Sequence, residues 1–511
     1  MLRENKKRAR GIRRLAVVIV IAAVVFPTGM WAQCDSSETA HNRSEDNRIK
    51  AAARAVSDGN KLLEKGEIDR AITEYRKSLG QLPTGAAHFN MGVALSRKGD
   101  QESAFAEYRE AERFGCPDAH TQLCYHLAFA GHWDEGITEC RTAAQLKPND
   151  ADAHYMLGFG LDGKNPDEAI AEYREAIRLK PDYGDAHYHL GYALSEKGDV
   201  DGAVGEFREA VRLEPKDAEA HCQFGIALAA KGEVDAAIAE YHTTLELEPD
   251  NGEAHYNLGT ALWQKDNLDG AIAEYREAVR LSSVGGGMPE WSLDLGKALS
   301  AKGDADAAMA QFREVLRINP DDPEAHFYLG VALAGKGDPD AATAEYRKAV
   351  ELKPDYSDAR INLGNLLADK GDLDGAIAEY RGAVRSNPDD PDTHYSLGYA
   401  LLDKGDVDSA IPELRKAALM KPENSDAHYC LGRALFEKGD GDGSITELRE
   451  ALRLKPDDAE AHYYLGRALS SKGDARGAAA EYRAALRLKP DYPDAHKSLI
   501  ELLAKKTTPK R

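Results

Sequence analysis

Apolar and polar residues recur along residues 52–492 with a period of 34 residues. A representative block, residues 184–217, reads GDAHYHLGYALSEKGDVDGAVGEFREAVRLEPKD. Each block contains two stretches whose apolar residues follow helical spacing. A fixed period of this length predicts stacked pairs of helices, whose core lies between neighbours. We therefore expect function on a long surface and not in a single pocket.

The polar residues between the two stretches predict where each helix begins and ends. In the representative block, Gly198 is expected to supply a left-handed C-terminal cap, and Asp199 to cap the next helix. Pro215 is expected to end the second helix. Numbering the block from Gly184 as position 1, position 8 is glycine in all but one repeat and position 20 is mostly alanine. Small residues there predict close approach of the paired helices.

Departures from the period divide the chain into segments. The segment SSVGGGM (282–288) adds residues and replaces the terminating proline, which predicts a hinge, although an insertion tolerated at the surface explains it as well. The predicted segments are a signal peptide or membrane anchor (1–32), a polar linker (33–51), repeats 1–7 (52–281), the glycine-rich hinge (282–288), repeats 8–13 (289–492), and a capping helix with a basic tail (493–511).

The N-terminal segment has the layout of an export signal. Residues 1–14 are basic and residues 15–26 are apolar, which is too short a run to cross a bilayer. Extending the run through Trp31 and Ala32 leaves an uncleaved anchor open, and Cys34 only weakly suggests lipidation. We expect an exported protein, either periplasmic or anchored in the bacterial cell envelope.

Charge and cysteine content narrow the function further. The formal net charge of −21 argues against nonspecific binding to nucleic acid or anionic membranes and favours basic partners. Cys124 and Cys140 occupy core-facing positions of one helix pair. They are expected either to form a disulfide in an oxidising compartment or to remain two small buried thiols.

No motif predicts catalysis, a cofactor or a metal. A histidine recurs at position 4, but successive rings on stacked helices are too far apart to converge on one ion, so we expect packed or partly exposed structural histidines. Acidic turns such as GDLDG (371–375) lack a complete calcium loop, and helix capping explains their aspartates. The recurring histidines are His88, His120, His154, His187, His221, His255, His326, His394, His428, His462 and His496.

The pattern of Leu-Gly, then alanine, an aromatic residue, alanine and proline resembles the tetratricopeptide repeat family. The large residue that opens the family pattern, usually tryptophan, is histidine here. The resemblance implies an all-α, right-handed superhelical solenoid of about thirteen antiparallel helix pairs, whose first helices line a concave groove, plus a C-terminal capping helix. It also implies a non-catalytic scaffold that binds proteins or peptides.

Positions 5 and 9, which face the concave side in that family, are mostly aromatic, and position 2 is mostly acidic. Such a channel is suited to a peptide with apolar anchors near Lys or Arg. Packing between repeats explains the same aromatic residues equally well. The candidate partner-binding residues are Phe89, Tyr125, Tyr155, Phe159, Tyr188, Tyr192, Tyr256, Phe327, Tyr395, Tyr399, Tyr429 and Tyr463.

We therefore predict a protein-interaction scaffold that is not an enzyme and needs no cofactor. The alternative is a subunit that presents substrates to a separate enzyme, such as a glycosyltransferase. The asparagines typical of the arrays in such transferases are mostly missing here, with Asn90, Asn257 and Asn362 as the exceptions. The concave positions also lack the Lys and Asn residues with which related arrays bind the acidic tails of chaperones.

Overall fold

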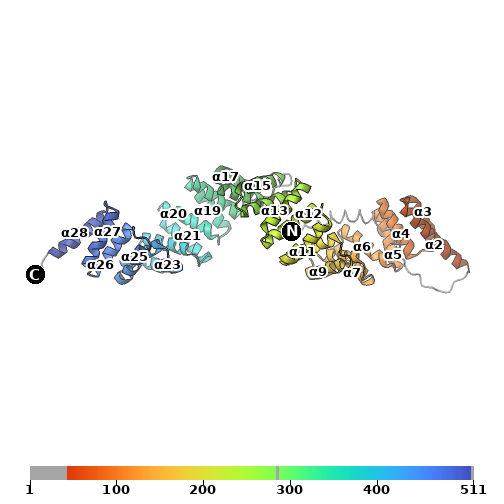
Figure 1. Cartoon of the computed structure of the whole chain (residues 1–511), viewed down its shortest axis with the longest axis horizontal. Helices are drawn as coiled ribbons and strands as arrows, with labels where there is room; N and C mark the ends of the chain where they lie inside the picture. The colour runs from red at the N-terminus through yellow and green to blue at the C-terminus, as the bar shows by residue number, and fades with distance from the viewer. Residues whose placement is uncertain (1–42, 283–286, 508–511) are drawn as a thin grey trace. The chain divides into compact units, whose positions relative to one another are not determined.

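The computed structural model describes residues 43–282 and 287–507, which form helices α2 to α28 and no strand (Figure 1). First and second helices of successive repeats alternate along the chain. The first helices are α2 (Arg43–Glu64), α4 (Gly85–Lys98), α6 (Pro117–Phe129), α8 (Ala151–Leu161), α10 (Gly184–Glu196), α12 (Ala218–Lys231), α14 (Gly252–Gln264), α16 (Pro289–Ala301), α18 (Pro323–Gly335), α20 (Ser357–Asp369), α22 (Pro391–Lys404), α24 (Ser425–Lys438) and α26 (Ala459–Ser471). The second helices are α3 (Ile68–Gln81), α5 (Gln101–Arg113), α7 (Trp133–Leu146), α9 (Pro166–Leu179), α11 (Val200–Leu213), α13 (Val234–Leu247), α15 (Leu268–Ser282), α17 (Ala305–Ile318), α19 (Pro339–Leu352), α21 (Leu373–Ser386), α23 (Val407–Met420), α25 (Gly441–Leu454) and α27 (Ala475–Leu488). Helix α28 (Pro493–Thr507) follows the last pair, so the predicted all-α array with a terminal helix is confirmed.

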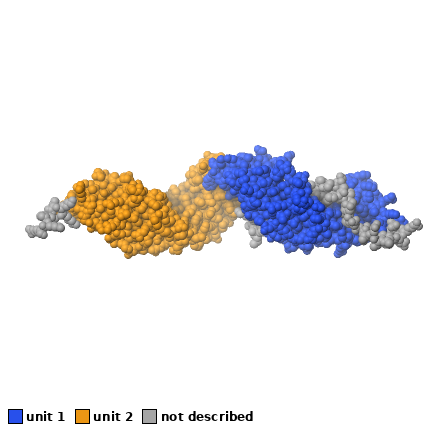
Figure 2. Space-filling model, turned by 60° about the horizontal axis from the view of Figure 1, so that its bottom comes forward, with its two compact units in different colours: residues 1–265 blue, residues 266–511 orange. Residues whose placement is uncertain are grey.

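The chain divides into two compact units, Met1–Lys265 and Asp266–Arg511 (Figure 2). In the first unit, the pairs from α2/α3 to α12/α13 pack in chain order and α14 follows them. In the second, α15 precedes the pairs from α16/α17 to α26/α27. Residues 283–286 of the expected hinge lie outside the described residues, and that hinge stays a prediction.

The turn at the boundary between the units differs from the other inter-helix turns. Asp266 has a φ of 59°, the only positive φ of a non-glycine residue in the described part of the chain. Most repeats have glycine at this place, for example Gly232 with a φ of 87° and Gly303 with 87°. A left-handed backbone is unfavourable for a residue with a Cβ atom, although Asp tolerates it better than most.

The N-terminal end of the array extends further than the sequence predicts. Helix α2 begins at Arg43, so the last residues of the segment expected as a linker are helical. The Arg48 guanidinium donates to the carbonyl of Gln81 at the end of α3, with its Nε 3.2 Å and its Nη2 2.7 Å from the oxygen. Residues 1–42, including the expected signal or anchor, lie outside the described residues. Among the described helices, none is long and apolar enough to cross a membrane.

The helix ends follow the predicted capping. Between α10 and α11, Gly198 has a φ of 80°, and the Asp199 carboxylate accepts a hydrogen bond from the backbone N–H of Gly202 at 3.0 Å. Helix α11 ends at Leu213, two residues before Pro215. These contacts satisfy backbone groups that a helix end would otherwise leave unpaired.

In most pairs, the position-8 glycine lies against the large side chain at position 24 of the second helix. A Cβ atom added to Gly225 would lie 2.6 Å from Cε1 of Tyr241, whose side chain is fully buried between the helices. The same contact joins Gly59 with Tyr75, Gly92 with Tyr108, Gly158 with Tyr173, Gly191 with Phe207, Gly296 with Phe312, Gly330 with Tyr346, Gly364 with Tyr380, Gly398 with Leu414, Gly432 with Leu448 and Gly466 with Tyr482. The small residue therefore sets the distance between the paired helices.

Neighbouring repeats are also joined by a row of exposed ion pairs. The lysine at position 14 of one repeat contacts the aspartate at position 18 of the preceding repeat, as in Lys98 with Asp69 (2.7 Å) and Lys370 with Asp340 (2.6 Å). Exposed pairs of this kind each contribute about 1 kcal/mol at most. They favour one register between repeats more than they add stability.

Candidate functional site

Within each unit, the first helices form the inner face of the array. They contact the first helices of neighbouring repeats more closely than second helices contact second helices. Positions 5 and 9 are four residues apart and therefore share one side of a helix. The candidate aromatic residues accordingly lie in rows along this inner face.

The structure separates the twelve candidates into two groups by exposure. Six are buried, namely Phe89, Tyr125, Tyr155, Tyr188, Phe327 and Tyr463. The others are Phe159, Tyr192, Tyr256, Tyr395 and Tyr429, which are partly exposed, and Tyr399, which is 47% exposed. In the described conformation, only the second group offers ring surface to a partner.

The buried rings at position 5 pack against two other aromatic side chains. The Tyr155 ring lies 6.1 Å from the ring of Tyr173 on the paired helix and 4.9 Å from Tyr183 at the end of the repeat. The rings of Phe327 and Tyr356 are 5.0 Å apart, and so are those of Tyr463 and Tyr492. Aromatic pairs at these distances stabilise the core, so position 5 contributes to packing in these repeats.

Aromatic and arginine side chains that are at least partly exposed lie on α22, α24 and α26. We call this group the C-terminal inner face; it comprises Tyr395, Tyr399, Tyr429, Arg433, Phe436, Tyr464 and Arg467. The Arg467 guanidinium lies 4.6 Å from the centre of the Phe436 ring and 5.4 Å from that of Tyr464. Arg433 lies 5.7 Å from the same Tyr464 ring. Cation–π contacts of this kind hold the rings in place before any partner arrives.

Two hydroxyl groups of this face remain protonated. Burial raises the pKa of Tyr395 well above its usual value, and the nearby Cys430 and Asp426 add to the shift. Burial and the carboxylate of Glu460 likewise raise the pKa of Tyr429, whose hydroxyl donates to Glu460 at 3.0 Å. Tyr395 and Tyr429 therefore present neutral polar groups beside their rings.

The acidic residues at position 2 are only partly available to a partner. Asp392 is 3.0 Å from Lys421 Nζ, Glu324 is 3.2 Å from Lys297 Nζ, and Asp118 pairs with Lys147. Asp358 and Asp426 are exposed at the edge of the inner face. The edge of the inner face is therefore acidic, but lysine side chains neutralise some of its carboxylates.

The recurring histidines tie each repeat to its neighbour. His187 Nδ1 is 2.6 Å from Oε2 of Glu206 on the paired helix, and its Nε2 is 3.0 Å from the carbonyl oxygen of Pro181 in the preceding repeat. The same two contacts are formed by His154, His221, His326, His394, His428 and His462. In repeat 10, Arg360 replaces the histidine and bonds to Glu379 and to the carbonyl of Pro354.

This geometry requires a proton on both ring nitrogens when the glutamate is ionised. A carbonyl oxygen only accepts, and so does a carboxylate, so each nitrogen must donate. The hydrogen bond with Glu172 raises the pKa of His154, and that with Glu481 raises the pKa of His462. Burial opposes charge on His187, yet its bonds to Glu206 and Pro181 raise its pKa overall. The sequence showed the recurrence of histidine but not these partners, although glutamate at position 23 recurs with the same period.

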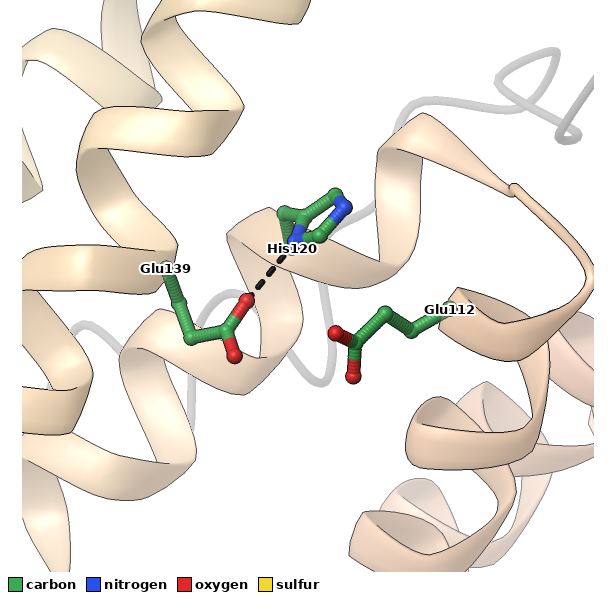
Figure 3. A group of neighbouring side chains, drawn as sticks. All are labelled: Glu112, His120 and Glu139. Atoms are coloured by element: carbon green, nitrogen blue, oxygen red, sulfur yellow. Dashed lines mark hydrogen bonds and ion pairs between the residues drawn. The ribbon is translucent and has the colours of Figure 1, made fainter.

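One carboxylate-histidine cluster has the composition of a metal site. Glu112 of α5, His120 of α6 and Glu139 of α7 place their possible ligand atoms within 4.8 Å of one another (Figure 3). The Arg109 Nη1 atom lies 2.9 Å from Glu112 and 2.6 Å from Glu139. Because this guanidinium already pairs with both carboxylates, we interpret the cluster as an ion-pair network that joins three helices.

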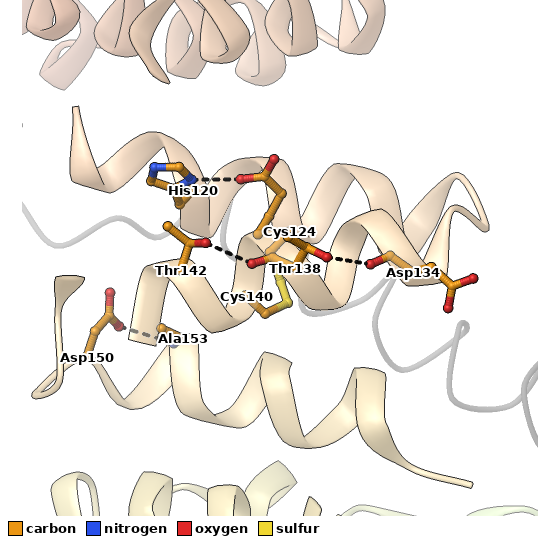
Figure 4. The surroundings of a disulfide bond; sticks show 9 residues. His120, Cys124, Asp134, Thr138, Cys140, Thr142, Asp150 and Ala153 are labelled. Atoms are coloured by element: carbon orange, nitrogen blue, oxygen red, sulfur yellow. Dashed lines mark hydrogen bonds and ion pairs between the residues drawn. A yellow bond between two sulfur atoms is a disulfide. The ribbon is translucent and has the colours of Figure 1, made fainter. Parts of the chain in front are cut away.

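Cys124 of α6 and Cys140 of α7 form a disulfide with a Cα–Cα distance of 5.1 Å (Figure 4). These are positions 8 and 24 of repeat 3, the two places that glycine and a large side chain occupy elsewhere. The bond thus replaces the usual contact between the paired helices. The two buried thiols that the sequence left as the alternative are not what the structure shows.

Comparison with known proteins gives consistent matches along the array. A profile described as Tetratricopeptide repeat matches residues 59–119, 222–285, 293–357, 395–459 and 429–493. One described as TPR repeat matches residues 162–198, 191–232 and 364–405, and another Tetratricopeptide repeat profile matches residues 345–378. No curated protein matches the chain in sequence.

Several solved structures resemble parts of the chain. YrrB, described as a TPR protein with an unusual peptide-binding site, is 24% identical, with 38% of this chain and 97% of that one covered and a TM-score of 0.35. The APC/C heterotetramer Cut9-Hcn1 is 16% identical, with 91% and 97% covered and a TM-score of 0.35. The C-terminal part of a TPR repeat-containing protein from Cytophaga hutchinsonii is 18% identical, with 48% and 99% covered and a TM-score of 0.41.

Proposed function

The chain belongs to the tetratricopeptide repeat family, and from this premise we propose that it is a non-catalytic scaffold that binds protein or peptide segments along its inner face. The observation that carries the proposal is the C-terminal inner face, where Tyr399 leaves 47% of its surface exposed beside Tyr395. Rings that are held in place but open to solvent offer apolar contact at a low entropic cost.

We further propose that partner segments combine apolar or aromatic side chains with basic residues. Asp358 and Asp426 are exposed at the edge of the inner face, and the chain carries a net charge of −21. An acidic chain attracts basic segments over distances of about 10 Å at moderate salt. Arg467 modifies this preference locally, since it adds a positive charge among the rings, whereas Arg433 is paired with Glu437 at 3.0 Å.

Localisation outside the cytoplasm is part of the proposal. Residues 1–26 have the charge and apolar pattern of an export signal. The disulfide between Cys124 and Cys140 supports an oxidising compartment, because such bonds are rare in the cytosol of most organisms. Attachment to a membrane would then depend on the N-terminal segment.

Site-specific photo-crosslinking tests the proposal. A photoreactive amino acid at position 399 should capture partner proteins in cells, whereas one at position 114 should not. Phe114 is a matched control, because it is 49% exposed but lies at the end of the second helix α5. Equal capture at both positions would count against an inner-face site. One dominant enzyme among the captured proteins would instead favour a subunit that presents substrates to that enzyme.

The accompanying variants separate binding from folding. Tyr395→Ala with Tyr399→Ala should abolish capture from a crosslinker placed at position 433 while changing the melting temperature little. A large loss of melting temperature with unchanged capture would show that the two rings serve only the core.

A further inference from the structure

The outer faces of α21 and α23 carry a group of cations that the inner-face function does not use. In six repeats, an arginine at position 29 pairs with a glutamate at position 26, as in Arg212 with Glu209 (2.8 Å) and Arg317 with Glu314 (2.7 Å). In repeats 10 and 11, position 26 is Gly382 and Lys416 instead. The local acidic partner is therefore missing in two successive repeats.

Four cations lie on these two helices. Arg381, Arg385 and Arg415 are exposed and Lys416 is partly exposed, and in the described part of the chain none of them forms an ion pair with a carboxylate. Lys416 Nζ donates to the carbonyl oxygen of Pro388 at 2.6 Å. Arg178, Arg280 and Arg453 each pair with a glutamate of their own helix, whereas Arg208, Arg449 and Arg487 have no ion pair with a carboxylate in the described part of the chain.

Three acidic groups on these helices and their caps are already engaged. Glu379 bonds to Arg360, and Glu413 is 2.6 Å from His394 Nδ1. Asp406 caps α23 by accepting from the backbone N–H of Ser409 at 3.2 Å, and it interacts with Arg381 only at longer range. The four cations therefore have no direct carboxylate partner, although the chain as a whole is acidic.

An open depression of about 380 Å³ lies between these helices. Its lining includes the cations Arg381 and Arg385, the carboxylate Glu413, and the apolar side chains of Leu397, Leu401 and Pro412. Further along α23, Leu419 is 78% exposed, more than any other large apolar side chain in the described residues. The depression thus combines two arginines with apolar lining residues.

We propose that this outer-face site, formed by the depression with Arg381 and Arg385 and by Arg415, Lys416 and Leu419 on α23, binds an acidic peptide segment with an apolar side chain between its carboxylates. Arginine pairs well with carboxylates in two-point geometry, and the depression accommodates one apolar side chain. The site lies on second helices, so it allows a second partner to bind while the inner face is occupied. It is independent of the function proposed for the inner face.

Fluorescence anisotropy with the full-length protein tests this site. The probe is a fluorescein-labelled peptide of sequence Glu-Glu-Leu-Glu-Glu-Phe-Glu-Glu, compared with the same peptide carrying Gln for every Glu. Arg381→Gln with Arg385→Gln should weaken binding of the acidic peptide about tenfold, since two charge contacts of the usual size are lost. Binding should also weaken as salt rises.

Matched variants distinguish binding at this site from nonspecific electrostatic attraction between the peptide and the protein. Arg208→Gln with Arg212→Gln makes the same change at the same positions of repeat 5, where Arg212 is paired, and should leave binding unchanged. Tyr399→Ala should also leave it unchanged, so failure of the inner-face proposal does not affect this test. Circular dichroism confirms that each variant is folded.

Three outcomes would overturn the proposal. The first is equal binding of the acidic and the Gln peptides, and the second is equal weakening by the two arginine pairs. The third is full displacement of the peptide by millimolar inorganic phosphate, which would identify a site for small anions.

Discussion

Replacing Gly225 by alanine and, separately, Gly205 by alanine makes the same chemical change at two helical sites with opposite surroundings. On α12, the new Cβ atom of Gly225→Ala would lie 2.6 Å from Cε1, 2.8 Å from Cδ1 and 3.1 Å from Cζ of Tyr241. The Tyr241 side chain is 2% exposed, so its ring has no free space into which to move. On α11, Gly205 is exposed and has no atom within 4 Å of the corresponding position.

The two sites differ in the balance of two effects. Alanine in place of glycine inside a helix stabilises it by about 1 kcal/mol. At Gly205 this gain stands alone. At Gly225 the new atom is roughly 1 Å closer to the ring than normal carbon contact allows, and overpacking of a core costs about 1–3 kcal/mol. We expect Gly205→Ala to stabilise and Gly225→Ala to leave stability unchanged or lower it by about 2 kcal/mol.

Hydrogen exchange followed by mass spectrometry is the suitable assay. A long repeat array does not unfold in one step, so a single free energy of unfolding is not defined. Exchange reports the local opening free energy of each helix pair. Amides of α12 and α13 should lose protection in Gly225→Ala, and amides of α10 and α11 should gain it in Gly205→Ala. Equal gains in protection at both sites would refute the claim that position 8 sets the distance between paired helices.

Three further predictions concern the histidine–glutamate bond, the disulfide and the turn at Asp266. The pKa of His187 is raised in the folded state, so its bond to Glu206 stabilises the fold fully below the unfolded pKa of about 6.5, and this stabilisation is lost as pH rises through the folded pKa. The melting temperature should therefore fall from pH 6 to pH 8.5. A rise would contradict the geometry in which both ring nitrogens donate. Cys124→Gly should destabilise the protein by about 3 kcal/mol under oxidising conditions, as expected for the loss of a disulfide that closes a loop of this size. Adding Cys140→Tyr should restore most of the lost melting temperature, because it recreates the contact between glycine and ring. If the melting temperature is not restored, repeat 3 packs differently from the other repeats. Asp266→Gly should raise the melting temperature by relieving a left-handed backbone that costs about 1 kcal/mol; a decrease would indicate that the aspartate side chain stabilises this turn.

The ends of the helices were predictable because their signals are local. Gly198, Asp199 and Pro215 act on backbone groups within four residues of themselves, so the sequence alone places the turn and the cap. The small residue at position 8 was likewise readable as a packing constraint. The side chain against which it packs could not be predicted in this way, since Tyr241 lies 16 residues beyond Gly225, on another helix.

The candidate site was only partly predictable, for the same reason. Positions 5 and 9 appear equivalent in the sequence, because both are aromatic and lie on one side of the helix. Tyr155 is 1% exposed and Tyr399 is 47% exposed, and the difference depends on rings from other elements, such as Tyr183 in the case of Tyr155. Exposure is a property of the assembled neighbours and cannot be read from one helix.

The sequence by itself determined the period, the pairing of helices, their caps and the small contact positions, because each follows from hydrophobic spacing or from backbone chemistry within a few residues. Only the tertiary structure decided which aromatic residues face solvent and which proton acceptors surround His187. Those outcomes depend on side chains 6 to 34 residues apart that meet only when repeats stack, and packing across that distance has no local signal.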